Sequence, residues 1–185
     1  MKPSQTEMRR EYQKWYSEFW SNQTTWCACW PRPSGHWWRG MMLDRINAAR
    51  AAHNLPALSE NAMLTQAAHD HAADLSRNPA LIDTGRWHDG SDGSDIGTRI
   101  TRAGYRGARW LEVVGWGWGG DESRMFDWWM ASPVHRAAIL SPDVTEAGAA
   151  VVNAPGSVWG FYFVVNFGRP VAQPVKKACP CCGRM

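Results

Sequence analysis

The sequence has no cysteine between residues 30 and 178. A small secreted domain held together by disulfides would carry cysteines throughout its fold, so this distribution argues against such a framework. An odd number of cysteines confined to the two ends favours a reducing compartment or a metal site instead. The five cysteines are Cys27, Cys29, Cys179, Cys181 and Cys182.

Other absences exclude further classes of protein. No run of about 18 apolar residues occurs, so we expect no transmembrane segment. Residues 1–20 carry charges throughout and lack an apolar centre, so we expect no secretory signal peptide. Synthesis in the cytoplasm, with incorporation into a virion or surface assembly, is then the expected route. The net charge of +3 and the lack of a basic block interleaved with aromatics predict no nucleic-acid partner.

Tryptophan, by contrast, is abundant, with 13 residues in the chain, many of them before residue 40. Residues 4–20 place apolar side chains on one helical face, which predicts an amphipathic helix. Since aromatic side chains are frequent anchors of protein interfaces, we expect an N-terminal arm, residues 1–37, to bind a protein partner. The alternative is that the arm packs on its own domain. The candidate anchors are Met8, Tyr12, Trp15, Phe19 and Trp20.

Residues 38–170 have the pattern of one domain, followed by a tail over residues 171–185. Helices are expected over residues 41–54, after Ser59 as a cap, and from Asp121 or Ser123 onward. The last third predicts an antiparallel hairpin around "NAPG". Its second strand is apolar on both faces and therefore needs helices on both sides, which predicts a three-layer α/β/α sandwich. One face is expected to hold Trp159, Phe161, Phe163, Val165 and Phe167, and the other Val158, Tyr162 and Val164.

Several polar residues stand out against this pattern. In "WMASPVHRAAIL", Ser132 and Pro133 are suited to start a helix, yet the helix start does not need His135. Glu112 is flanked by apolar residues, so we expect it to be partly buried and to require a partner. His71 lies on an apolar helical stripe and is expected to be a core histidine. The Asp-rich loop over residues 88–97 lacks the alternate spacing of a calcium loop and indicates Asx-turns.

Six blocks occur in an order that resembles the CAP superfamily of cysteine-rich secretory, antigen-five and pathogenesis-related (SCP-like) proteins, in its short bacterial form. The resemblance covers residues 42–169. It implies a cleft with two histidines and two acidic residues that sometimes hold a divalent cation, here His88, Glu112, His135 and Glu146. The blocks are "LDRINAARAAHNLPALS", "LTQAAHDHAADL", "WHDGSDGSDIGTRITRAGY", "WLEVVGWG", "WWMASPVHRAAILSPDVTEAGAAVV" and "FYFVVNFGRP".

Three residues depart from the family pattern around this cleft. Leu111 and Val113 replace the glycine and asparagine that flank the family's glutamate, and Val134 replaces a glycine before the second histidine. These changes make the cleft drier. Two readings stay open: the histidines and carboxylates hold Zn²⁺ or a similar ion, or they form a hydrogen-bonded polar cluster that ties a helix to a strand.

The resemblance implies a binding or structural role, because the fold hosts many activities and many members bind lipids, surfaces or proteins. With the Trp-rich arm, this predicts an accessory subunit of a larger assembly, and it leaves lipid binding open. The alternative is a metal-assisted hydrolase of cell-wall polysaccharide or peptide. In that case His88, Glu112 and His135 would be ligands and Glu146 the base.

The terminal cysteines predict a second metal site. Cys179 and Cys182 are spaced as in a zinc knuckle, and Cys27 with Cys29 supplies a second pair, so a structural Cys₄ zinc site is expected to join the two tails. Cys181 is then spare or an alternative ligand. Two disulfides with one free thiol, or five unlinked cysteines, are the competing readings.

Overall fold

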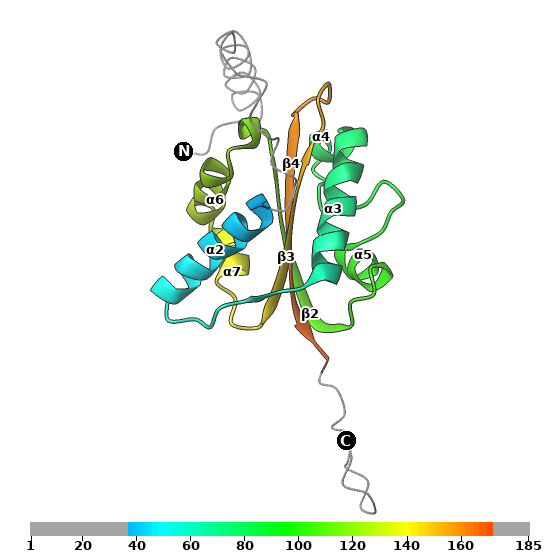
Figure 1. Cartoon of the computed structure of the whole chain (residues 1–185). Helices are drawn as coiled ribbons and strands as arrows, with labels where there is room; N and C mark the ends of the chain where they lie inside the picture. Colours follow the sequence, from blue (N-terminus) through cyan, green and yellow to red (C-terminus); the bar gives the residue numbers. More distant parts are fainter. Residues whose placement is uncertain (1–36, 172–185) are drawn as a thin grey trace, which may run out of the picture.

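The structure, a computed structural model, describes the backbone of residues 37–171 and the side chains of residues 41–171 (Figure 1). The interface predicted for Met8, Tyr12, Trp15, Phe19 and Trp20 lies outside the described residues. The zinc site predicted for Cys27, Cys29, Cys179 and Cys182 lies outside them as well. Within residues 37–171, no helix has the length and apolar character needed to span a bilayer.

The described residues form a four-stranded sheet with helices on both faces (Figure 1). The strands are arranged in the order β1-β3-β4-β2. Strand β4 pairs antiparallel with both of its neighbours, and β1 pairs parallel with β3. The elements are α2 (Trp37–Ala52), β1 (Ser59–Glu60), α3 (Ala62–Arg77), α4 (Ala80–Asp83), α5 (Ile96–Arg102), β2 (Gly107–Trp116), the 3₁₀ helix η1 (Trp118–Gly120), α6 (Glu122–Ala131), α7 (Pro133–Ile139), β3 (Glu146–Asn153) and β4 (Phe161–Pro170).

Strand β4 lies inside the sheet and is buried on both faces, as its sequence predicted. Phe163, Val165 and Phe167 pack into the cluster formed with α2, α6 and α7. Tyr162 and Val164 pack into the cluster on the opposite face, with α3 and α4. Figure 1 shows α2, α6 and α7 on one side of the sheet and α3 and α5 on the other. The α/β/α sandwich is therefore confirmed.

Trp159 lies on the face opposite to the one expected. It is 2% exposed and packs with Tyr162 and Val164. The alternation of faces applies only within a strand, and β4 begins at Phe161, after a bend in which Gly160 has a φ of 71°. A prediction that extends the period of two through this bend assigns Trp159 wrongly.

The start of α3 also differs from the expectation. Ser59 does not cap the helix but pairs with Glu146 in the short strand β1. The cap is Asn61, whose side-chain oxygen accepts the backbone N–H groups of Met63 and Leu64 at 3.0 and 3.3 Å. Because β1 pairs with β3, the first turn of α3 is held directly over β3.

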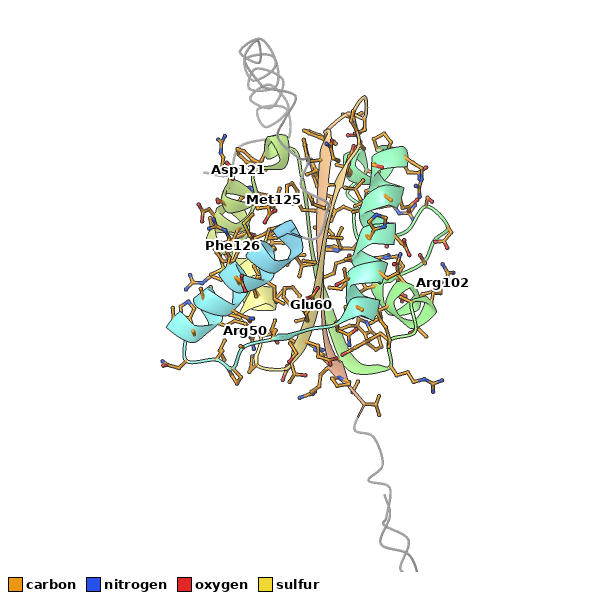
Figure 2. The ribbon with its side chains drawn as sticks, viewed as in Figure 1. Arg50, Glu60, Arg102, Asp121, Met125 and Phe126 are labelled. Atoms are coloured by element: carbon orange, nitrogen blue, oxygen red, sulfur yellow. The ribbon has the colours of Figure 1, made fainter. Side chains whose placement is uncertain are left out.

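Helix α7, which carries His135, begins as predicted, with Ser132 at the cap position and Pro133 as its first residue. Its far end is held by Arg50 of α2, which is labelled in Figure 2. Arg50 is 1% exposed. The Arg50 guanidinium donates to the carbonyls of Ile139 and Ser141 at 2.9 and 2.8 Å. This satisfies carbonyls that the end of a helix leaves without partners.

Candidate functional site

Glu112 of β2 is the centre of a buried polar cluster. Successive side chains of a strand point to opposite faces, and its neighbours Leu111 and Val113 pack toward α2, α6 and α7. Glu112 therefore points to the α3 side of the sheet. Its side chain is fully buried. The sequence predicted a partly buried carboxylate with a partner, and the structure buries the side chain completely.

The main partner of Glu112 is Arg99 of α5. One guanidinium nitrogen, Nη2, donates to both carboxylate oxygens, at 3.0 and 2.9 Å. The other, Nη1, donates to the backbone carbonyls of His88 and Ser94 at 2.9 and 3.0 Å. Arg99 is itself 9% exposed. A buried charge on β2 is thus matched by a buried charge on α5.

The loop over residues 88–97 positions these carbonyls. Asp92 accepts the N–H of Ser94 at 2.9 Å, and Asp95 caps α5 by accepting the N–H of Thr98 at 2.7 Å. These are the local side-chain turns that the sequence predicted in place of a calcium loop. Through them, the loop delivers the Ser94 carbonyl to Arg99.

His88 is the solvent-facing member of the cluster. Its Nδ1 lies 2.9 Å from Oε1 of Glu112, and its side chain is 41% exposed. A carboxylate only accepts, so Nδ1 carries the proton, and in the neutral ring Nε2 is an acceptor. Nε2 has no hydrogen-bond partner among residues 41–171. Chemically, this is a carboxylate-oriented imidazole that can accept a proton or a hydrogen bond.

Two further residues, Asn166 and His71, complete the cluster around Glu112. With its amide oriented to satisfy both atoms, Asn166 of β4 donates to Oε2 of Glu112 at 3.0 Å and accepts the N–H of Ala68 at 3.1 Å. His71 of α3 is fully buried, as expected of a core histidine, and its Nε2 donates to the carbonyl of Trp87 at 2.9 Å. The same nitrogen lies 3.8 Å from Oε1 of Glu112.

These contacts decide the charge of Glu112. Burial raises the pKa of its carboxyl, while the hydrogen bond from His88 and the positive charge of Arg99 lower it. The pKa ends below its usual value, because the donors outweigh the loss of hydration. Glu112 is therefore ionised in the folded protein.

We predict that the domain loses stability in mild acid because His71 is buried in its neutral form. Burial lowers its pKa, against a smaller rise caused by the charge of Glu112. The unfolded chain, with an ordinary histidine pKa of 6.5, binds a proton first as the pH falls. The contribution of His71 is therefore complete above that value and is lost below it, by up to about 1.4 kcal/mol per pH unit. Thermal unfolding should show this loss as the pH falls below about 6.5, and His71→Asn should remove it.

The matched control is His69→Asn on the same helix, because His69 is exposed, with 47% of its side chain accessible. This variant should keep the pH dependence of the wild type. An identical pH dependence in His71→Asn and the wild type would contradict a neutral, buried His71.

His135 and Glu146 lie apart from this cluster. His135 is in α7, on the opposite face of the sheet from Glu112, and its ring packs on Trp128 with centroids 5.0 Å apart. Glu146 is on β3, separated from β2 by β4, and its Oε2 accepts from the Tyr105 hydroxyl at 2.7 Å and from Asn61 at 3.3 Å. The structure thus brings His88 and Glu112 together and places His135 and Glu146 elsewhere.

The residues present do not fit the cleft cation that the family resemblance implies. Within the described part of the chain, no group of three or more His, Cys, Asp or Glu residues is placed to hold a metal ion. Both oxygens of Glu112 already accept hydrogen bonds, and a guanidinium lies at 2.9 Å. The arrangement agrees with the alternative to an ion site, a hydrogen-bonded polar cluster. This cluster links α3 and α5 to β2.

Sequence reasoning missed Arg99 and Asn166 as partners of Glu112. Arg99 is next to Ile100 in a short helix, and a charge beside apolar residues in "IGTRI" is the signal that was available. Asn166 lies between Val165 and Phe167 in a strand that is otherwise buried, which indicates a satisfied buried amide. Neither pattern by itself says which partner each residue meets.

Most of the described chain matches one protein family. The model of the cysteine-rich secretory protein family, CAP, matches residues 43–167. The search of curated protein sequences gives no significant match.

Solved structures show the same fold at low identity. An outer surface protein from Borrelia burgdorferi is 22% identical, with a TM-score of 0.62, over 71% of this chain and 92% of that chain. An extracellular protein containing an SCP domain from Bacillus anthracis is 23% identical, with a TM-score of 0.57, over 71% of this chain and 40% of that chain. A cysteine-rich secretory protein from Staphylococcus aureus is 17% identical, with a TM-score of 0.54, over 75% and 40% of the two chains.

Proposed function

Since the chain belongs to the CAP family, the cysteine-rich secretory protein family, we propose that it is a binding or structural protein, an accessory subunit of a larger assembly such as a virion or a cell-surface complex. The observation that carries this proposal is the state of Glu112. Its carboxylate is fully buried and engaged by Arg99, His88 and Asn166. A carboxylate committed to internal partners consolidates a domain, and it is poorly placed to react with a substrate.

The metal-assisted hydrolase has less support. Such an enzyme needs several protein ligands on one ion and an open coordination position. His135 lies across the sheet from Glu112, and the proposed base, Glu146, is held by Tyr105 and Asn61. These placements favour a scaffold that presents other surfaces for binding.

The attachment to the assembly is assigned to the N-terminal arm. The sequence of residues 4–20 has its own apolar helical stripe, which includes Trp15 and Phe19. Among residues 41–171, buried apolar side chains form clusters on both faces of the sheet. An arm with a separate stripe is therefore suited to bind a protein partner.

Deletion of residues 1–25 tests this proposal. The shortened chain is expected to keep the melting temperature of the full chain, because residues 41–171 supply apolar clusters on both faces of the sheet, and to lose its association with the assembly. The measurement is density-gradient sedimentation of both chains after expression in the native cells, with mild cross-linking. The full chain should sediment with a large complex and the shortened chain as a free protein.

The matched control is Trp110→Ala, which removes an exposed tryptophan of the domain, 41% accessible, and should leave sedimentation unchanged. Trp15→Ala combined with Trp20→Ala should reproduce the deletion. A shortened chain that unfolds would show that the arm belongs to the domain's own core. A shortened chain that still sediments with the complex would place the interface on the domain.

A further inference from the structure

The guanidinium of Arg99 occupies the position beside Glu112 that a divalent cation would need. We infer that Arg99 is the resident cation of the buried cluster around Glu112, and that this cluster consequently does not bind Zn²⁺ or a similar ion. This separates the chain from the cation-holding cleft implied by its family resemblance. The inference concerns the chemistry of the cluster around Glu112 and does not depend on the proposed role as an accessory subunit.

The first argument is that Glu112 has no free lone pair. A carboxylate offers about four acceptor positions on its two oxygens. Oε1 accepts from His88 at 2.9 Å and from Arg99 at 3.0 Å. Oε2 accepts from Arg99 at 2.9 Å and from Asn166 at 3.0 Å. A metal ion would have to displace one of these donors.

The second argument is that the Arg99 guanidinium cannot easily move away from Glu112. Its Nη1 donates to the carbonyls of His88 and Ser94, which belong to the same loop. Arg99 is 9% exposed, so a change of rotamer that moves the guanidinium into solvent has little room. A zinc ion would bind a carboxylate oxygen at about 2.0–2.2 Å and would then lie against a fixed positive charge. Because the site is buried, water would screen this repulsion poorly.

The third argument concerns the histidines. His88 donates the proton of Nδ1 to Glu112 and would have to lose it to bind a metal through that atom. Its Nε2 would be a single protein ligand. His71 lies nearby, but its Nε2 already donates to the carbonyl of Trp87 at 2.9 Å. The donor set is therefore organised around a guanidinium and not around a metal ion.

Zinc titration of the full chain tests this inference, with equilibrium dialysis for stoichiometry and melting temperature as a second readout. The tail cysteines can bind zinc themselves, so the comparison is between variants that share the same tails. The wild type and His88→Ala should bind equal amounts of zinc and show the same zinc-dependent change in melting temperature. Zinc binding by the wild type that His88→Ala removes would overturn the inference.

Arg99→Gln tests whether the guanidinium is the cause. Its loss frees one acceptor position on each oxygen of Glu112 and leaves a negative charge beside His88 and His71. This variant should gain zinc binding and a zinc-dependent rise in melting temperature, and a second change of His88→Ala should abolish both. A folded Arg99→Gln that gains no zinc binding would overturn the role given to Arg99. If Arg99→Gln does not fold, the comparison of the wild type with His88→Ala decides the question.

Discussion

Replacing Glu112 by Gln is expected to destabilise the domain by about 3–5 kcal/mol. The amide keeps the shape of the side chain but removes the negative charge beside Arg99, whose side chain is 9% exposed. A buried cation without a counter-charge is costly because it has lost its hydration and gained no compensating attraction. Urea unfolding monitored by circular dichroism measures the change in the free energy of unfolding.

The control for this variant is Asp89→Asn, which removes the charge of another Arg–carboxylate pair. Arg86 and Asp89 also meet at 2.9 Å, but their side chains are 58% and 43% exposed. Since exposed ion pairs contribute at most about 1 kcal/mol, Asp89→Asn should change stability only slightly. The two variants differ mainly in burial, so their difference measures what burial adds.

A double variant measures the energetic coupling between Arg99 and Glu112. Arg99→Met together with Glu112→Gln removes both charges, so the combined loss of stability should be smaller than the sum of the two single losses. Additive losses would mean that the two side chains act independently. That outcome, or a loss below about 1 kcal/mol for Glu112→Gln, would contradict the assignment of Glu112 as an ionised, buried partner of Arg99.

The change of Gly148 to Ala is expected to destabilise the domain by about 3 kcal/mol, the upper end of the usual cost of overpacking. Gly148 of β3 faces the first turn of α3, where an added Cβ would lie 2.1 Å from the backbone nitrogen of Thr65 and 2.4 Å from the carbonyl carbon of Leu64. These are backbone atoms, so no side-chain rotation relieves the contact. Helix α3 would have to move away from the sheet. This movement would displace Leu64, which is fully buried, and the N-cap formed by Asn61.

Gly97→Ala is the matched control, because it adds the same methyl group next to a side chain that can change its rotamer. Its Cβ would lie 2.8 Å from the ring of Trp110, which is 41% exposed and can turn aside. Alanine is also preferred over glycine in a helix by about 1 kcal/mol, so this change should be nearly neutral. Equal denaturation midpoints for the two alanine variants would contradict the close packing of α3 on β3.

The sequence by itself determined the layers of this protein. Strand β4 is apolar on both faces, and a strand of that kind must be covered on both sides. The same kind of argument identified His71 as a core residue and predicted that Glu112 is at least partly buried and has a partner, because apolar neighbours imply burial and a buried charge requires compensation. These conclusions depend on the local pattern, which the tertiary structure then follows.

The tertiary structure alone decided which residues meet. Helices α5 and α7 are both short, and nothing in their sequences states which face of an equally apolar sheet each one covers. The chain places α5 on the face of Glu112, so Arg99 becomes the partner of this carboxylate, and it places α7 on the other face with His135. A buried charge demands a partner, but its identity follows from how the helices pack over the two faces of the sheet, which spacing along the chain does not encode.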